Sequence, residues 1–125
     1  MSELLITFTP EFKSEYKKLV RKCRSLNVDM RGLVANLQEN PTLGTALGNN
    51  AYKIRLAITS KNKGKSGGAR IITYFITEDQ ELYLLSIYDK SEQADISDSL
   101  LKQLIKNTTG NKWILVKQEI QREFM

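Results

Sequence analysis

The chain has 125 residues, 41% apolar and 26% charged, and its 19 lysines and arginines outnumber 14 acidic residues to give a net charge of +5. This length and composition fit one globular domain with a single hydrophobic core. The absence of histidine excludes a Ser-His-Asp or Cys-His nucleophilic system and histidine metal ligands. The one cysteine, Cys23, excludes an internal disulfide and a cysteine zinc site, so we expect neither a metal nor a cofactor.

The start of the chain does not have the pattern of a signal peptide, because it carries Glu3 and only a short apolar stretch. The longest mostly apolar run, residues 82–88, is far shorter than the roughly 18 residues of a membrane span. We therefore expect a soluble, cytoplasmic protein with no membrane partner.

The N-terminal part predicts one strand followed by two helices. Residues 3–8 form a short apolar strand, and Thr9 is the expected N-cap of a helix that begins at Pro10. Apolar side chains at helical spacing continue this helix to about residue 24 and place Cys23 in the core. After a short break at residues 26–27, Met30, Leu33, Val34 and Leu37 indicate a second helix that ends near Glu39. So tight a link predicts an antiparallel helical hairpin.

The central part predicts three strands. An irregular connection over residues 42–50 leads into a half-buried strand at 52–59, in which apolar and polar residues alternate. A loop rich in glycine, lysine and serine, residues 60–68, precedes a strand at 69–77 that is apolar on both faces except at Arg70. A tight turn then opens the strand at 81–88. These links are too short for a crossover, so the three strands are expected to be antiparallel neighbours.

The C-terminal part predicts a helix opened by Ser97 and stopped near Gly110, followed by an extension at residues 111–125. We expect one domain at 1–110 and a tail whose apolar spacing is helical, although its first residues fit a strand equally well. The tail packs on its own domain or faces a partner. The order of elements predicts an α+β fold. Its antiparallel sheet, a three-stranded hairpin core plus the N-terminal strand, is packed by the helical hairpin and the C-terminal helix.

The positive charge is concentrated in residues 53–70, which hold six lysines and arginines and no acidic residue. The rest of the chain therefore has 13 cations and 14 anions, a net charge of −1. Strand parity puts Lys53 and Arg55 on one face, about 6.5–7 Å apart. Arg70 returns to the same end of the sheet on the next strand, and the strand at 81–88 ends beside Lys90. This distribution indicates an anionic partner such as nucleic acid.

The loop sequence Lys63-Gly64-Lys65-Ser66 ends like a phosphate-binding P-loop but does not fit that motif. Thr59 stands where the motif needs its first glycine, and a strand rather than a helix follows. Cleavage of RNA is chemically feasible without histidine or metal, because RNA supplies its own 2′-hydroxyl nucleophile. Crowded lysines repel one another, so one of them can serve as the base, while arginine stays charged and stabilises the phosphate. A basic patch that only binds an anion is the alternative.

Three stretches of the sequence resemble the RelE/HigB group of bacterial type II toxin–antitoxin toxins. They are residues 52–57, residues 64–72 with the sequence Gly-Lys-Ser-Gly-Gly-Ala-Arg-Ile-Ile, and residues 87–92. The resemblance covers about residues 3–107 and implies a RelE/ParE-like α+β domain that enters the ribosomal A site and cuts mRNA during translation. It also implies a cognate antitoxin that neutralises the toxin by binding.

The resemblance assigns a role to each basic residue. Lys53 and Arg55 are similar to the basic pair of the second strand, and Arg70 to the arginine that stabilises the phosphate. Tyr88 and Lys90 are similar to the pair near the scissile phosphate, where Tyr88 stacks on a base or aids proton transfer. Lys63 and Lys65 are similar to loop residues that contact RNA. Lys61 stands in the same basic loop, and we expect it to contact RNA with them.

Several alternatives stay open at this point. Some members of the group use histidine or an acid in the site, and this chain has no histidine, so the resemblance implies a lysine-based mechanism. Asp89 is expected to cap a turn, and Lys90 could instead pair with Glu92. ParE-type toxins share the fold and inhibit DNA gyrase, although they generally lack the basic set. A non-catalytic RNA- or protein-binding module of the same fold is the other rival.

Overall fold

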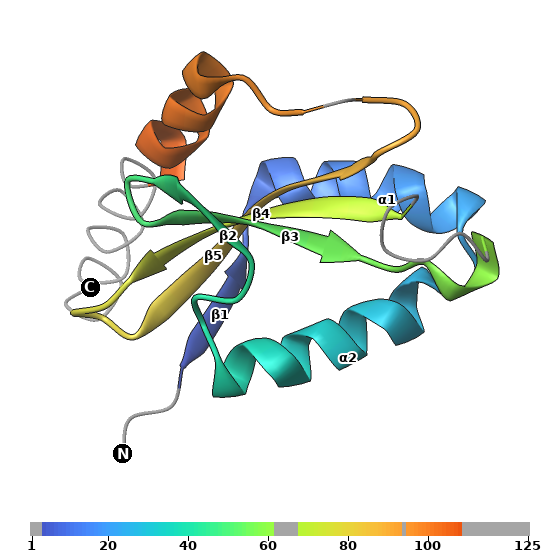
Figure 1. Ribbon diagram of the computed structural model, residues 1–125, viewed down its shortest axis with the longest axis horizontal. Coiled ribbons are helices and arrows are strands. Elements are labelled where there is room, and N and C mark those ends of the chain that lie inside the picture. The colour runs from blue at the N-terminus through green and yellow to red at the C-terminus, as the bar shows by residue number, and fades with distance from the viewer. Residues whose placement is uncertain (1–3, 62–67, 94, 109–125) are drawn as a thin grey trace, which may run out of the picture. The chain divides into compact units, whose positions relative to one another are not determined.

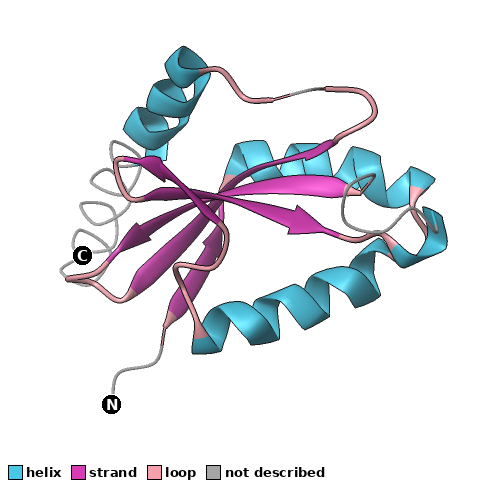
Figure 2. Cartoon of the chain, viewed as in Figure 1, coloured by secondary structure: helices cyan, strands magenta, loops and turns pink. Residues whose placement is uncertain are grey.

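The computed structural model describes residues 4–61, 68–93 and 95–108. Residues Met1–Asp95 form one compact unit, and Ile96–Met125 form a second. Within the described residues, five strands form one sheet in the order β1-β5-β4-β3-β2. The strands are β1 (Leu5–Phe8), β2 (Thr45–Gly48), β3 (Ala51–Leu56), β4 (Ala69–Ile76) and β5 (Glu81–Asp89). Figure 2 shows them fanning out with the twist typical of sheets.

The predicted helical hairpin is present as α1 (Pro10–Lys22) and α2 (Leu26–Glu39), which run in opposite directions (Figure 1). Thr9 caps α1, because its hydroxyl accepts a hydrogen bond from the backbone N–H of Phe12 at 3.2 Å. The second helix begins earlier than predicted: the break lies at residues 23–25, and Leu26 is already helical and fully buried.

One core joins the two helices to one face of the sheet. Cys23 is fully buried in it, as predicted. This core contains apolar residues of both helices, of the break between them and of the three central strands. They are Phe12, Leu19, Cys23, Leu26, Met30, Leu33, Leu37, Ile54, Leu56, Ala69, Ile71, Phe75, Leu82, Leu84 and Ile87. Since side chains alternate along a strand, residues next to these on β3 and β4 face away from the helices.

The α+β class is confirmed, but the predicted antiparallel sheet is wrong in two details. β1 pairs with β5 in parallel, with Leu5 opposite Glu81, so the sheet is mixed. The connection between these two strands contains the rest of the sheet and both helices, and such a long connection permits a parallel pair. In addition, β2 occupies part of the connection predicted to be irregular. It pairs with β3 through a turn at Asn49 and Asn50, whose φ values of 55° and 64° suit a two-residue hairpin.

The C-terminal unit is described over residues 96–108. Ser97 opens a helix over residues 98–108, and its hydroxyl accepts a hydrogen bond from the backbone N–H of Leu100 at 3.2 Å. This confirms the predicted helix start. The predicted stop at Gly110 and the tail at 111–125 lie outside the described residues, so the 1–110 and 111–125 division stays a prediction.

Two glycines give a matched test of the fold. A Cβ on Gly68 would lie 2.1 Å from the backbone oxygen of Leu56, whereas a Cβ on Gly32, inside α2, would meet nothing within 4 Å. We expect Gly68→Ala to lower the free energy of unfolding by about 1–3 kcal/mol, since strand backbone must move. Gly32→Ala should raise it by about 0.5–1 kcal/mol through helix propensity. Urea unfolding measures both, and a Gly68→Ala protein as stable as the wild type would contradict this geometry.

Candidate functional site

The predicted site residues of the three central strands meet on one face of the sheet. Arg55 lies opposite Arg70, and Arg70 lies opposite Tyr88, so the three form a row across β3, β4 and β5. Directly opposed residues have side chains about 4.5–5.5 Å apart. Lys53 lies two residue pairs further along β3, on the same face, opposite Ile72. We call these four residues the basic face.

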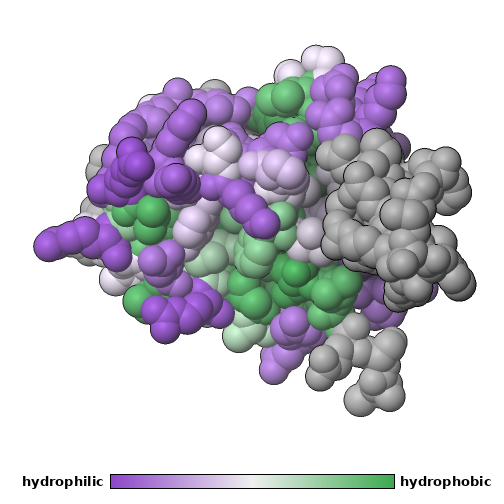
Figure 3. Space-filling view, turned by 180° about the vertical axis from the view of Figure 1, so that it is seen from behind, coloured by the Kyte–Doolittle hydropathy of each residue, from purple (hydrophilic) through white to green (hydrophobic). Residues whose placement is uncertain are grey.

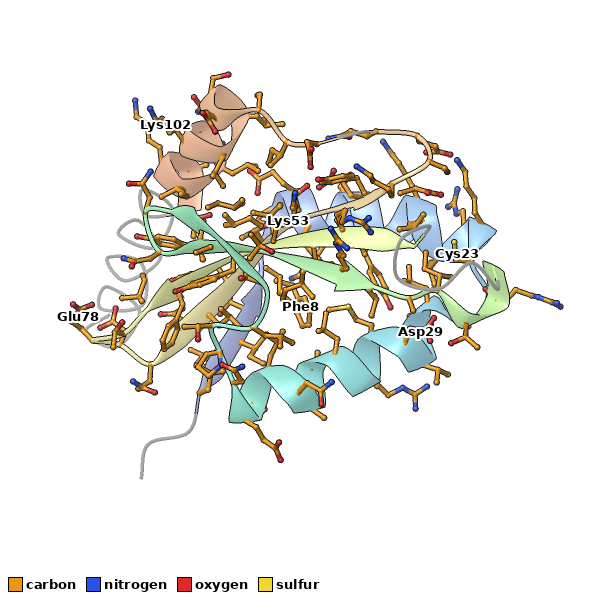
Figure 4. All side chains as sticks on the ribbon, in the orientation of Figure 1. Phe8, Cys23, Asp29, Lys53, Glu78 and Lys102 are labelled. Carbon is orange, nitrogen blue, oxygen red and sulfur yellow. The ribbon has the colours of Figure 1, made fainter. Side chains whose placement is uncertain are left out.

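The basic face is on the side of the sheet opposite the helices. Ile54, Ile71 and Ile87 belong to the core shared with α1 and α2, and each lies next to a residue of the basic face. Figure 4 shows Lys53 on the side of the strands away from α2, and Phe8 between the strands and α2. The sheet therefore separates a cationic surface from the hydrophobic core.

A β-bulge in β5 brings Tyr88 to this face. Ile72 of β4 pairs with Ser86, and the next residue of β4, Thr73, pairs with Leu84. Leu85 is therefore the extra residue of the bulge. Leu82 and Leu84 point into the core, and after the bulge Ile87 does so. Without the bulge, Tyr88 would share the core side with Leu84.

Glu15 of α1 holds the bulge. Its carboxylate accepts a hydrogen bond from the Ser86 hydroxyl at 2.9 Å and another from the backbone N–H of Ile87. Partial burial raises the pKa of Glu15, although these two hydrogen bonds act in the opposite direction. Helix α1 thus occupies the outer edge of β5 beyond the end of β1, where Thr9 also donates to the Leu84 carbonyl at 3.0 Å.

The four residues of the basic face differ in their exposure. Arg70 and Tyr88 are buried, with 4% and 6% of their surface exposed. One Nη of Arg70 donates to the carbonyl of Ala69 at 3.3 Å. Lys53 is half-buried and Arg55 is exposed. Packing therefore fixes the side chains of Arg70 and Tyr88, while the side chain of Arg55 is open to a ligand.

The turn after β5 positions Lys90. Its backbone N–H donates to the carbonyl of Gly68 at 3.1 Å, which ties this turn to the start of β4. Asp89 caps the turn as predicted, because its carboxylate accepts from the backbone N–H and hydroxyl of Ser91 at 2.9 and 2.7 Å. Glu92 pairs with Lys22 at 2.8 Å, so the described ion pair of Glu92 is not with Lys90.

Sequence reasoning missed Asp95, which faces the cations of the site. Its Oδ1 lies 3.0 Å from Nζ of Lys53. The hydrogen bond and charge of Lys53, and then the charges of Lys90 and Arg70, hold the pKa of Asp95 below its ordinary value. No motif includes Asp95, and it is 42 residues from Lys53 in sequence. Only the path of the chain after β5 brings the two together.

Of the three predicted loop lysines, the structure describes Lys61. Lys61 ends the short 3₁₀ helix η1 (Thr59–Lys61), and Lys63 and Lys65 lie outside the described residues. Asp29 of α2 anchors η1, because its carboxylate accepts from the Thr59 hydroxyl at 2.6 Å and from the Thr59 backbone N–H at 3.0 Å. The Ser25 hydroxyl donates to the same carboxylate at 2.8 Å. Figure 4 shows Asp29 near the start of α2.

Two hollows lie beside these elements. A cleft of about 670 Å³ runs between α2 and β3, and its lining includes Asp29, Leu33 and Ile54. A second hollow, of about 430 Å³, is lined by apolar side chains of β1, α1 and α2, and we call it the apolar groove. They are Phe8, Phe12, Tyr16, Val20 and Met30, with Lys13 and Lys17 at the rim. Figure 3 shows a patch of apolar side chains bordered by polar ones on the back of the molecule.

Two further findings concern only the part of the chain that the structure describes. It contains no group of three or more Cys, Asp or Glu side chains that could hold a metal ion. No helix in it is long and apolar enough to cross a membrane.

These features define a small α+β protein with a concentrated cationic face on its sheet. A family model described as the RelE toxin of the RelE / RelB toxin-antitoxin system matches residues 12–123. The chain therefore belongs to the RelE toxin family. The match extends into residues 111–123, beyond the limit near residue 107 that the sequence motifs indicate.

Solved structures of E. coli RelE share the fold at low sequence identity. An arginine-to-alanine double mutant of E. coli RelE in the free state is 16% identical, with a TM-score of 0.56, over 85% of this chain and 98% of that one. The isolated E. coli RelE toxin is 19% identical, with a TM-score of 0.53, over 82% and 97%. The toxin in the intact E. coli RelBE toxin-antitoxin complex is 19% identical, with a TM-score of 0.51, over 69% and 95%.

The anchor between α2 and η1 predicts a pH dependence of stability. Burial alone would raise the pKa of Asp29, but the hydrogen bonds from Thr59 and Ser25 outweigh it and lower the pKa below 3.8. A lowered folded-state pKa means that this stabilisation is present above pH 3.8 and is lost as the pH falls through the folded value. We expect Asp29→Ala to cost about 1–3 kcal/mol at pH 7 and less in acid. Urea unfolding at pH 7 and pH 3 measures the difference, and an equal cost at both would refute the assignment.

Proposed function

We propose that this toxin is a ribosome-dependent endoribonuclease that cuts mRNA in the A site without a metal ion and so inhibits translation. The observation that carries the proposal is the row of Arg55, Arg70 and Tyr88, with Lys53 beside it, on one face of three adjacent strands. The exposed guanidinium of Arg55, the half-buried ammonium of Lys53 and the buried guanidinium of Arg70 between neighbouring strands give this face the positive charge that suits the phosphates of a nucleic-acid strand. Because bacterial mRNA is translated in the cytoplasm, we propose that the reaction takes place there.

The chemistry follows from the 2′-hydroxyl of RNA. A lysine, Lys53 or Lys90, takes the proton of the 2′-hydroxyl, and the oxygen attacks the adjacent phosphorus. The bond from phosphorus to the 5′-oxygen breaks, and that oxygen receives a proton from a second lysine. The products are a 2′,3′-cyclic phosphate and a 5′-hydroxyl. In this scheme, Arg70 and Arg55 stabilise the charge that develops on the phosphate oxygens.

The exposure of these residues supports a division of roles. Arg70 and Tyr88 are held by packing, which suits groups that must meet one phosphate in a fixed geometry. We assign the phosphate to Arg70, and a base or the proton transfer to Tyr88. Arg55 is exposed and suits a neighbouring phosphate of the strand. Lys61, Lys63 and Lys65 are proposed to contact RNA further along.

We also propose a cognate antitoxin as the second partner. Membership of the RelE family supports it, as does the E. coli RelE complex with its antitoxin. The apolar groove, with Lys13 and Lys17 at its rim, suits an amphipathic segment that carries acidic residues.

The proposal is tested by inducing the protein in growing bacteria and mapping transcript ends by primer extension. The wild type should arrest growth and yield new 5′ ends inside translated codons. Arg55→Gln should lower cleavage by about tenfold to a hundredfold, since one charge on the phosphate is lost. Arg31→Gln is the matched control, because Arg31 is an exposed arginine on α2, outside the basic face, and it should cleave as the wild type does.

Each rival has its own result in this experiment. Growth arrest with intact mRNA and inhibited gyrase would support a ParE-like toxin. RNA binding without cleavage, even with ribosomes present, would support a non-catalytic module. Equal cleavage by Arg55→Gln and the wild type would show that the basic face is not the site.

A further inference from the structure

The carboxylate of Asp95 lies where the positive charges of the site converge. It is 3.0 Å from Nζ of Lys53, and the charges of Lys90 and Arg70 also act on it. These cations come from β3, β4 and the turn after β5. Lys53–Asp95 and Lys22–Glu92 are two ion pairs between described residues, with N–O distances of 3.0 and 2.8 Å. One of the two therefore engages a lysine of the basic face.

A carboxylate and a phosphate diester have the same charge and present similar oxygen acceptors. Both bind lysine through short, charge-assisted hydrogen bonds. Lysine has three N–H donors, but the donor of Lys53 that points at Asp95 at 3.0 Å can reach an RNA phosphate at that position only if the carboxylate leaves it. The two anions are therefore alternatives at one position.

We propose that Asp95 occupies an RNA-phosphate position in the RNA-free protein and must leave Lys53 before that phosphate binds. This inference rests on the proposed function, since it assumes that the anion bound by the basic face belongs to RNA. The side chain of Asp95 is 59% exposed, so it can turn into solvent without breaking the core. Lys53, with 24% of its side chain exposed, stays on β3 to receive the phosphate.

The surroundings of Asp95 favour this role over that of a general base. A base works best when its pKa is near the working pH, and the cations around Asp95 lower its pKa instead. A competing anion, in contrast, binds more strongly because of those same cations. The two roles make different predictions for Asp95→Asn, which removes the charge and keeps the shape.

The test measures binding of a fluorescein-labelled single-stranded RNA whose riboses are all 2′-O-methylated and so cannot be cleaved. Fluorescence anisotropy should show Asp95→Asn binding about three- to tenfold more tightly than the wild type, because the competitor is gone. Glu92→Gln is the matched control: it removes one charge from the same segment, where Glu92 pairs with Lys22 outside the basic face. It should change binding by less than about twofold.

Three further measurements separate displacement from a general charge effect and from a catalytic role. The slope of log K against log salt should become steeper by about 0.7 in Asp95→Asn, since Lys53 then gains a phosphate without releasing a carboxylate. In a Lys53→Met background, Asp95→Asn should give little or no gain. Cleavage of translated mRNA by Asp95→Asn should equal or exceed that of the wild type.

The outcomes distinguish this inference from the function on which it rests. If the wild type binds the RNA and Asp95→Asn binds no more tightly than Glu92→Gln, the inference is wrong while the proposed function stands. If Asp95→Asn binds well but no longer cleaves, Asp95 is a base, and displacement is not its role. If no form binds RNA and none cleaves translated mRNA, the proposed function fails as well.

Discussion

The one-residue bulge at Leu85 is the constraint on which the arrangement of the site depends. Without it, Tyr88 would point into the core, and Arg70 would face no aromatic partner on β5. The bulge is stable because Glu15 accepts hydrogen bonds from Ser86 and from the backbone of Ile87. A carboxylate on the first helix thus fixes the direction of a side chain at the far end of the last strand.

In the absence of a ligand, the positive charges of the basic face repel one another and destabilise the folded protein. Arg55 and Arg70 are directly opposed on neighbouring strands, where like charges are destabilising. Asp95 offsets part of this repulsion by its contact with Lys53 and by its field at Arg70 and Lys90. The same arrangement that makes the surface attractive to a phosphate therefore explains why an internal anion is found there.

Sequence reasoning predicted the elements well where periodicity is strong and poorly where distant segments meet. The helices, the three central strands and the shared face of Lys53 and Arg55 follow from spacing alone. The parallel pairing of β1 and the bulge do not, because residues 82–85 are apolar on both faces and carry no parity signal. Asp95 was missed for a different reason, because its neighbours are set by the chain path after β5 and not by a local pattern.

The central claim is that the basic face promotes attack by the 2′-hydroxyl of RNA. The most direct measurement is cleavage, in a translating extract, of an mRNA that carries a single 2′-deoxy nucleotide on the 5′ side of the mapped cut. This transcript should stay intact at that position, while the unmodified transcript should yield a 2′,3′-cyclic phosphate and a 5′-hydroxyl. Equal cleavage of both transcripts would contradict it.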